Sequence, residues 1–152
     1  NNTLPRAWFV NKTEVVSEED VWNKIMQPDF DPRHIAYVPN EVSVSSGGQV
    51  SITHFEKNIH RITMSTESDG NHFLVLSEVY YPLRWKAKID GEETQTHIVN
   101  GILRGVVVPT GKHTIEFIYD KSAFNKGLTI SFVSFVMALG FIGLGYFGNK
   151  KS

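Results

Sequence analysis

Phe73-Leu-Val-Leu-Ser-Glu-Val-Tyr80 is the stretch of this sequence that decides the fold. It is apolar at nearly every position, which is typical of a strand whose two faces are both covered by other parts of the protein. We therefore expect residues 73–80 to form the central strand of a sheet.

Shorter segments with an apolar residue at every second position flank this strand. Trp85, Ala87 and Ile89 alternate with charged residues, for example, and Asp90-Gly91 then provides a tight turn. The other expected strands are residues 34–38, 50–55, 59–65, 94–99, 103–108 and 114–119. Many short strands separated by turn residues predict a mainly β fold, an antiparallel β-sandwich or jelly roll.

The N-terminal part adds one strand and one short helix to this prediction. Residues 7–10 (Ala-Trp-Phe-Val) form a short apolar run. Ser17-Glu-Glu-Asp20 matches a capping box, and Pro28 ends the helix that follows it. The apolar face of this helix consists of Val21, Trp22, Ile25 and Met26.

Residues 127–149 contain no charged side chain and are followed by Lys150-Lys151. About 20 mostly apolar residues suffice for a helix to cross the hydrocarbon of a bilayer. Glycines such as Gly140 and Gly143 would weaken a helix in water, but glycine is common in membrane helices and lets a second helix approach closely. We therefore expect a transmembrane helix that packs against other transmembrane helices. The alternative is a buried core helix or a pair of buried strands.

The expected organisation is thus an extracytoplasmic β domain (residues 1–126), a transmembrane helix (127–149) and a short cytoplasmic tail (150–152). The sidedness follows from Lys150-Lys151, because Lys and Arg beside a membrane helix favour the cytoplasmic face. The first residues, Asn-Asn-Thr, carry neither an initiator Met nor the features of a signal peptide. We therefore expect the chain to be the C-terminal part of a longer membrane protein.

Composition excludes several classes of site. Lys and Arg (15) nearly balance Asp and Glu (16), so no basic surface for nucleic acid is expected. Cysteine is absent, which excludes disulfides and thiolate metal sites. The 6 histidines lack the spacings of metal-binding motifs, and the sequence has neither Gly-x-Ser-x-Gly nor a phosphate-binding glycine loop. No metal, cofactor or catalytic residue is therefore expected in this chain.

Two longer stretches resemble one known family. They are residues 76–91 (LSEVYYPLRWKAKIDG) and residues 100–119 (NGILRGVVVPTGKHTIEFIY). Leu4-Pro-Arg-Ala-Trp-Phe-Val10 and Asp29-Phe-Asp-Pro32 match the same family in the same order. With the expected C-terminal helix, the chain resembles the C-terminal extracytoplasmic region of YfhO-family bacterial membrane proteins. The family usually carries glycine before the tryptophan, where this chain has Arg84.

That family is similar to GT-C-type glycosyltransferases, polytopic enzymes that use lipid-linked sugar donors on the outer face of the membrane. The resemblance implies that the parent protein glycosylates a cell-envelope polymer or lipid. It also implies a catalytic carboxylate in an early loop after the first membrane helix. No catalytic residue of the family therefore falls on this chain.

Glu78 is the one acidic residue inside the most apolar stretch. If its side chain points inward, burial would raise its pKa and make it a candidate site residue. The alternative, which we favour, is an ion pair with Arg84 or Lys86 at the exposed end of the strand.

Tyr80, Tyr81 and Trp85 surround Pro82, and they form a candidate ligand-binding surface with Arg84 and Glu78. Flat aromatic faces stack on sugar rings, while charged groups bind hydroxyls or an anionic polymer. The alternative, again favoured, is that Trp85 fills the sandwich core and the tyrosines cover its edge, because an aromatic residue in an alternating strand usually faces inward.

Two functional hypotheses follow. The first is an accessory domain that positions the acceptor of a glycosyltransferase-like membrane protein. The second is a membrane-anchored carbohydrate-binding or adhesion module without enzymatic activity. A self-contained hydrolase is disfavoured, since no nucleophile–base arrangement is evident. The expected partners are the bilayer, other membrane helices of the parent chain and an envelope glycan.

Overall fold

The computed structural model describes residues 3–45 and 48–149, except for the side chains of residue 123 and residues 141–149. The chain divides into two compact units, Asn1–Tyr119 and Asp120–Ser152. The expected tail, residues 150–152, lies outside the described residues.

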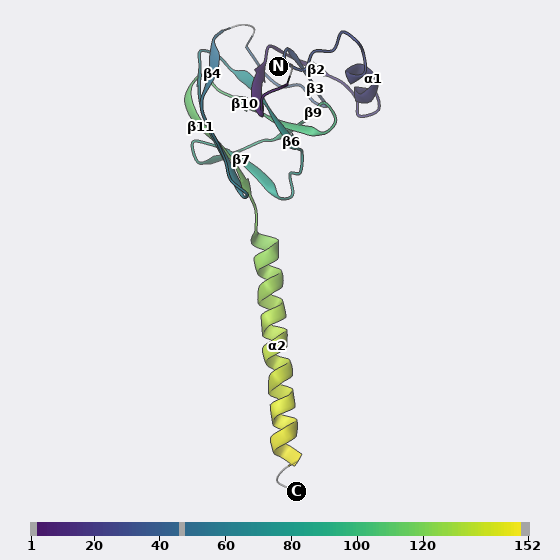
Figure 1. The fold of residues 1–152 in the computed structure, drawn as a ribbon, viewed down its shortest axis with the longest axis vertical. Coiled ribbons are helices and arrows are strands. Elements are labelled where there is room, and N and C mark those ends of the chain that lie inside the picture. Colours follow the sequence, from purple (N-terminus) through teal and green to yellow (C-terminus); the bar gives the residue numbers. More distant parts are fainter. Residues whose placement is uncertain (1–2, 46–47, 150–152) are drawn as a thin grey trace. The chain divides into compact units, whose positions relative to one another are not determined.

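The first unit is a β-sandwich of two antiparallel sheets (Figure 1). The four-stranded sheet has the order β1-β6-β10-β9 and the five-stranded sheet the order β4-β5-β11-β7-β8. The strands of the first sheet are β1 (Ala7–Val10), β6 (His72–Val79), β9 (His97–Val99) and β10 (Leu103–Val108). Those of the second are β4 (Val50–Lys57), β5 (Arg61–Ser68), β7 (Trp85–Ile89), β8 (Glu92–Thr94) and β11 (Gly111–Tyr119). The predicted mainly β, antiparallel fold is confirmed.

Strand β6 is an inner strand of its sheet, and residues 72–76 are buried, as the apolar run predicted. Leu74 and Leu76 belong to the core between the two sheets, together with Met64 and Phe117 from the opposite sheet. Phe73 packs on the other side of the sheet in a second apolar cluster, which includes residues of β3 (Ile35–Val38). Both faces of the strand are therefore covered, because a third layer lies over the outer face.

That third layer is formed by the N-terminal part of the chain. Strand β3 pairs in parallel with β2 (Lys12–Val15), and α1 spans Val21–Ile25. The hydroxyl of Ser17 accepts a hydrogen bond from the backbone N–H of Asp20 at 3.1 Å, which is one half of the predicted capping box. The helix itself begins only at Val21, and its N-cap residue, Asp20, makes no side-chain capping bond. The predicted apolar face is only partly buried, because Trp22 is 52% exposed and Met26 is 82% exposed.

One predicted strand is wrong. Residues 94–99 were expected to return from the Asp90-Gly91 turn as a single strand, but they belong to two. Strand β8 ends at Thr94 beside β7, and β9 begins at His97 beside β10 in the other sheet. The chain crosses between the sheets here, which the alternation of side chains along one segment cannot reveal.

The second unit contains one helix, α2 (Ser122–Asn149). Its described apolar side chains are exposed, including adjacent residues such as Phe132 (66%) and Val133 (47%). Among the helices whose residues are described, none combines the length and apolar character that a membrane crossing requires. The crossing predicted for residues 127–149 therefore stays a prediction, and the side chains of residues 141–149 lie outside the described part.

Candidate functional site

The predicted ligand-binding residues lie at the end of the sandwich where β6 leaves its sheet and β7 begins. Glu78 is near the end of β6, with its side chain 23% exposed. Its carboxylate pairs with Lys57 of β4 and, at 3.6 Å, with Arg6. Glu78 is thus ion-paired at the exposed end of its strand, as favoured, but its partners are not the predicted Arg84 or Lys86.

Trp85 is half-buried and packs against the core between the sheets. Its ring meets that of Tyr119 edge-on, with centroids 5.6 Å apart. The guanidinium carbon of Arg104 lies 4.7 Å from the centroid of the Trp85 ring. The indole of Trp85 therefore packs against other side chains in the core and at the sandwich end, which agrees with the favoured interpretation that Trp85 fills the core.

Tyr81 and Arg84 lie in the loop between β6 and β7 rather than on a strand. The N–H of Trp85 donates to the carbonyl of Tyr81 at 3.0 Å, which closes a turn around Pro82. Tyr81 is 47% exposed, and Tyr80 and Arg84 are half-buried. Among the described non-glycine residues only Asp90 and Asn100 have positive φ, so Arg84 fits its turn without strain.

Arg104 is the residue of this region that sequence reasoning missed. It is 2% exposed and lies over the rings of Trp85 and Phe117. Burial lowers the pKa of Arg104, and the nearby Glu78 carboxylate partly offsets that effect. Among the described residues, its Nε and Nη1 atoms have no hydrogen-bond partner. The sequence held one sign that Arg104 is buried. Arg104, Val106 and Val108 are at every second position of β10 and therefore share one face of the strand.

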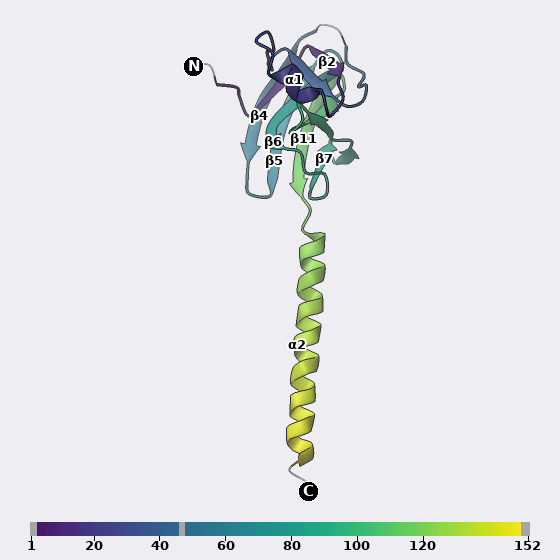
Figure 2. The same ribbon diagram turned by 90° about the vertical axis from the view of Figure 1, so that its right-hand side faces the viewer.

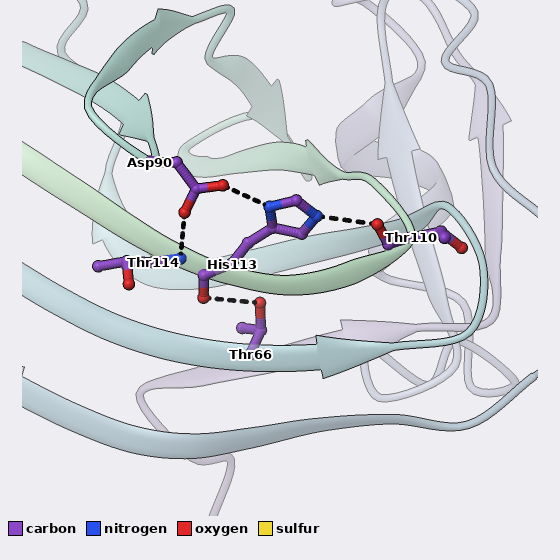
Figure 3. Close-up of polar contacts among 5 residues, drawn as sticks. All are labelled: Thr66, Asp90, Thr110, His113 and Thr114. Atoms are coloured by element: carbon purple, nitrogen blue, oxygen red, sulfur yellow. Dashed lines mark hydrogen bonds and ion pairs between the residues drawn. The ribbon is translucent and has the colours of Figure 1, made fainter.

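A histidine–carboxylate pair lies at the opposite end of β11 (Figure 3). Nδ1 of His113 is 2.6 Å from a carboxylate oxygen of Asp90, and Nε2 is 2.9 Å from the carbonyl oxygen of Thr110. The other carboxylate oxygen of Asp90 accepts the backbone N–H of Thr114 at 2.8 Å. The pair ties the β7–β8 turn to the β10–β11 turn.

This arrangement favours the charged form of both side chains. The bond from the Thr114 N–H and then the bond to His113 lower the pKa of Asp90. The bonds to Asp90 and then to the Thr110 carbonyl raise the pKa of His113. Because both ring nitrogens face acceptors, both must donate, and the imidazolium is the form that fits. Neither nitrogen is free to take a proton from a nucleophile, so this is a structural pair rather than a catalytic dyad.

A polar groove of about 930 Å³ runs along β4 and the β5–β6 turn. Its lining includes the side chains of Asn11, Gln49, Glu67 and Asp69, with Phe9 as the aromatic member. His72 lies behind it, buried, with Nε2 3.8 Å from an Asp69 carboxylate oxygen. Within residues 3–45 and 48–140, no cluster of three His, Asp or Glu side chains that could hold a metal ion is found.

Comparison with known families matches residues 37–131 to the family described as bacterial membrane protein YfhO. No curated protein and no solved structure matches the chain. The matched segment covers more than half of the chain. It includes both sheets except β1, together with the candidate residues from Glu78 to Arg104. The chain therefore belongs to the YfhO family of bacterial membrane proteins.

Proposed function

We propose that this chain is an accessory extracytoplasmic domain of a polytopic, glycosyltransferase-like membrane protein, and that it positions an envelope glycan or lipid acceptor. One observation carries this proposal: the chain belongs to a bacterial membrane protein family, and its β-sandwich leads directly into a long helix. That helix begins three residues after the end of the last strand. The domain performs no bond chemistry of its own.

The membrane anchor in this proposal is α2 with its uncharged run of residues 127–149. Its described apolar side chains do not follow a single stripe, since residues 132, 133, 135, 136 and 137 are all apolar and exposed. A helix that is apolar all round needs an apolar environment on every side. The sequence pair Lys150-Lys151 supports a cytoplasmic location for the far end of the helix and hence an outer location for the sandwich, because Lys and Arg beside a membrane helix favour the cytoplasmic face.

The acceptor would be contacted at the loop between β6 and β7. Tyr81 offers a half-exposed ring for stacking on a sugar, while Arg84 and Glu78 supply charge and hydrogen-bonding groups. Tyr80 and Trp85 are half-buried, so they support this loop from the protein interior and do not offer exposed ring faces for stacking. The saturated hydrogen bonding of His113 supports a binding role over a hydrolytic one.

The proposal is tested by binding and turnover measurements on the whole chain in lipid nanodiscs. The probes are peptidoglycan fragments and an anionic cell-envelope glycopolymer. We expect Y81A and R84A each to weaken binding about tenfold, which corresponds to about 1.4 kcal/mol. The control K112A removes a surface cation paired with Glu67 at the other end of the sandwich and should bind like the parent chain. Turnover of a lipid-linked sugar donor by this chain alone, or binding unaffected by both loop variants, would contradict the proposal.

A further inference from the structure

We infer that the end of the sandwich at which β11 ends dips into the headgroup region of the bilayer and contacts anionic lipid through its loop tips. We call this region the junction end and define it by residues 57–61, 79–84 and 100–102. The inference rests on the proposed function, in which α2 is embedded in the membrane. It adds a second lipid contact, made by the β domain itself.

Backbone contacts link two loops of the junction end to the last residue of β11 and the third loop to Tyr80. The backbone N–H of Tyr119 donates to the carbonyl of His60 at 2.9 Å, and Tyr119 pairs in register with Trp85. The N–H of Tyr80 donates to the carbonyl of Ile102 at 2.7 Å. The β4–β5 turn and the β6–β7 loop can be followed near the end of β11 in Figure 2.

The tips of these loops expose large apolar side chains. Ile59 is 87% exposed and Leu83 is 74% exposed, the highest values among the Ile and Leu residues of the first unit. Val79, Tyr81 and Ile102 add further exposed apolar surface, at 58%, 47% and 47%. The first unit has other exposed apolar side chains on β2 and near α1, and one of them, Trp22, lies close to Gly101 at the edge of the junction end. Apolar surface gathered on several loops marks a contact surface.

The charges around these tips suit an anionic lipid surface. Arg84 has no ion-pair partner among the described side chains. Lys121 and Lys126 follow the end of β11 by two and seven residues. Glu78 is flanked by Lys57 and Arg6, so its negative charge is compensated. Each Lys or Arg near an anionic lipid surface adds to the attraction, which falls off within a Debye length. The charge pattern therefore favours an anionic partner, and the short chain between β11 and α2 favours the lipid surface as that partner.

Chain connectivity keeps the junction end close to the membrane in any orientation of the two units. Two residues, Asp120 and Lys121, separate Tyr119 from Ser122, so the Cα atoms of Tyr119 and Ser122 are at most about 11 Å apart. The helix then rises about 8 Å from Ser122 to Gly127, where the uncharged run begins. Ile59 and Leu83 are one and two residues from the positions tied to Tyr119. Both tips are thus tethered within reach of the interfacial zone.

This placement narrows the acceptor class. Tyr81 and Arg84 would lie at headgroup level, where they can meet only a sugar carried on a lipid or a polymer segment close to its lipid anchor. The accessory domain would then select acceptors that are bound to the same membrane.

The absence of cysteine from the sequence allows a direct test by single-site spin labelling. The variants L83C, I59C, T110C and M137C carry a nitroxide in the otherwise intact chain, reconstituted in vesicles of phosphatidylcholine and phosphatidylglycerol. Thr110 is exposed at the far end of the sandwich and serves as the aqueous control, while Met137 lies in α2 and reports the anchor. Collision rates with oxygen, which partitions into lipid, are compared with those of a water-soluble nickel chelate.

We expect the oxygen-to-nickel ratio at L83C and I59C to be severalfold higher than at T110C, and to fall in vesicles of phosphatidylcholine alone. A high ratio at M137C with aqueous values at L83C and I59C would overturn this inference and leave the anchor intact. An aqueous value at M137C would overturn the proposed anchor and the inference together. Labels at L83C and I59C that are shielded from both reagents would show a protein partner on these tips and would also overturn it.

Discussion

The hydrogen-bonded pair of Asp90 and His113 gives a prediction about stability and pH. We consider H113Q, which keeps a side chain of similar length but removes the titratable imidazole. The His113 ring makes two hydrogen bonds, to Asp90 and to the carbonyl of Thr110 (Figure 3). These bonds connect the β7–β8 hairpin turn to the β10–β11 turn, which links the two sheets, so their loss should weaken the whole sandwich rather than one strand.

The expected magnitude follows from the exposure of the pair. Hydrogen bonds to charged groups contribute about 1.5–3 kcal/mol when they are protected from water. The Asp90 side chain is 52% exposed, so solvent screening lowers the contribution of this pair. We expect H113Q to reduce the free energy of unfolding by about 1 kcal/mol where both groups are charged.

The pH dependence has a definite sign. The pKa of His113 is raised in the folded protein, so its stabilisation is fully present below the unfolded value of 6.5 and is lost as pH rises through the folded pKa. The pKa of Asp90 is lowered, so its stabilisation is present above the unfolded value of 3.8 and is lost as pH falls through the folded pKa. The pair therefore stabilises the protein most between these two unfolded values.

Urea unfolding of the whole chain in detergent micelles, followed by tryptophan fluorescence, measures this effect at several pH values. The difference between the parent chain and H113Q isolates His113 from other histidines, such as His97, whose pKa burial lowers. D90N keeps an acceptor for the Thr114 N–H but should return the pKa of His113 toward its ordinary value in an NMR titration. If H113Q lowered the free energy of unfolding by about the same amount at pH 5.5 and at pH 9, the charged pair would be refuted.

Three further substitutions test packing and backbone geometry by the same unfolding assay. Asn100 has φ of 50° and accepts the buried N–H of Tyr37 at 2.9 Å, so N100A should cost about 2–4 kcal/mol. Glycine adopts a positive φ without strain, so N100G should lose about 1 kcal/mol less stability than N100A. Equal losses in the two variants would contradict a contribution from backbone strain. A Cβ on Gly105 would lie 2.7 Å from the Phe73 ring and 2.8 Å from the carbonyl oxygen of Leu74, so G105A should cost about 1–3 kcal/mol. F73L should be less harmful in the G105A background than alone, and strict additivity would count against the clash. R104M should change stability by less than about 1 kcal/mol, because the buried guanidinium lacks partners for two nitrogens, whereas R104A leaves a cavity and should cost about 2–4 kcal/mol. A large loss in R104M would show that the stacking on Trp85 and Phe117 outweighs the cost of burying the charge.

The candidate site was only partly predictable from sequence. The exposed ion pair at Glu78 and the inward packing of Trp85 followed from their places at a strand end and in an alternating strand. The partners of Glu78 did not, because Lys57 and Arg6 come from distant parts of the sequence. Arg6 is brought near by the pairing of β1 with β6, whereas Lys57 lies on the opposite sheet and meets Glu78 only because the two sheets pack together. Arg104 was overlooked for a related reason. A single cation in an apolar strand is expected at the surface, and only the stacked rings from the opposite sheet show that it is buried.

The sequence by itself determined most of the strands, the Asp90-Gly91 turn and the uncharged C-terminal run, because each depends on residue spacing within a short segment. It also sufficed to identify the family. It did not predict β2, and it merged β8 and β9 into one strand. Only the tertiary structure decided which sheet each strand joins, where residues 94–99 change sheets, and that Asp90 and His113 meet. These features depend on contacts between residues far apart in the chain, whose choice is set by packing of the whole core rather than by local periodicity.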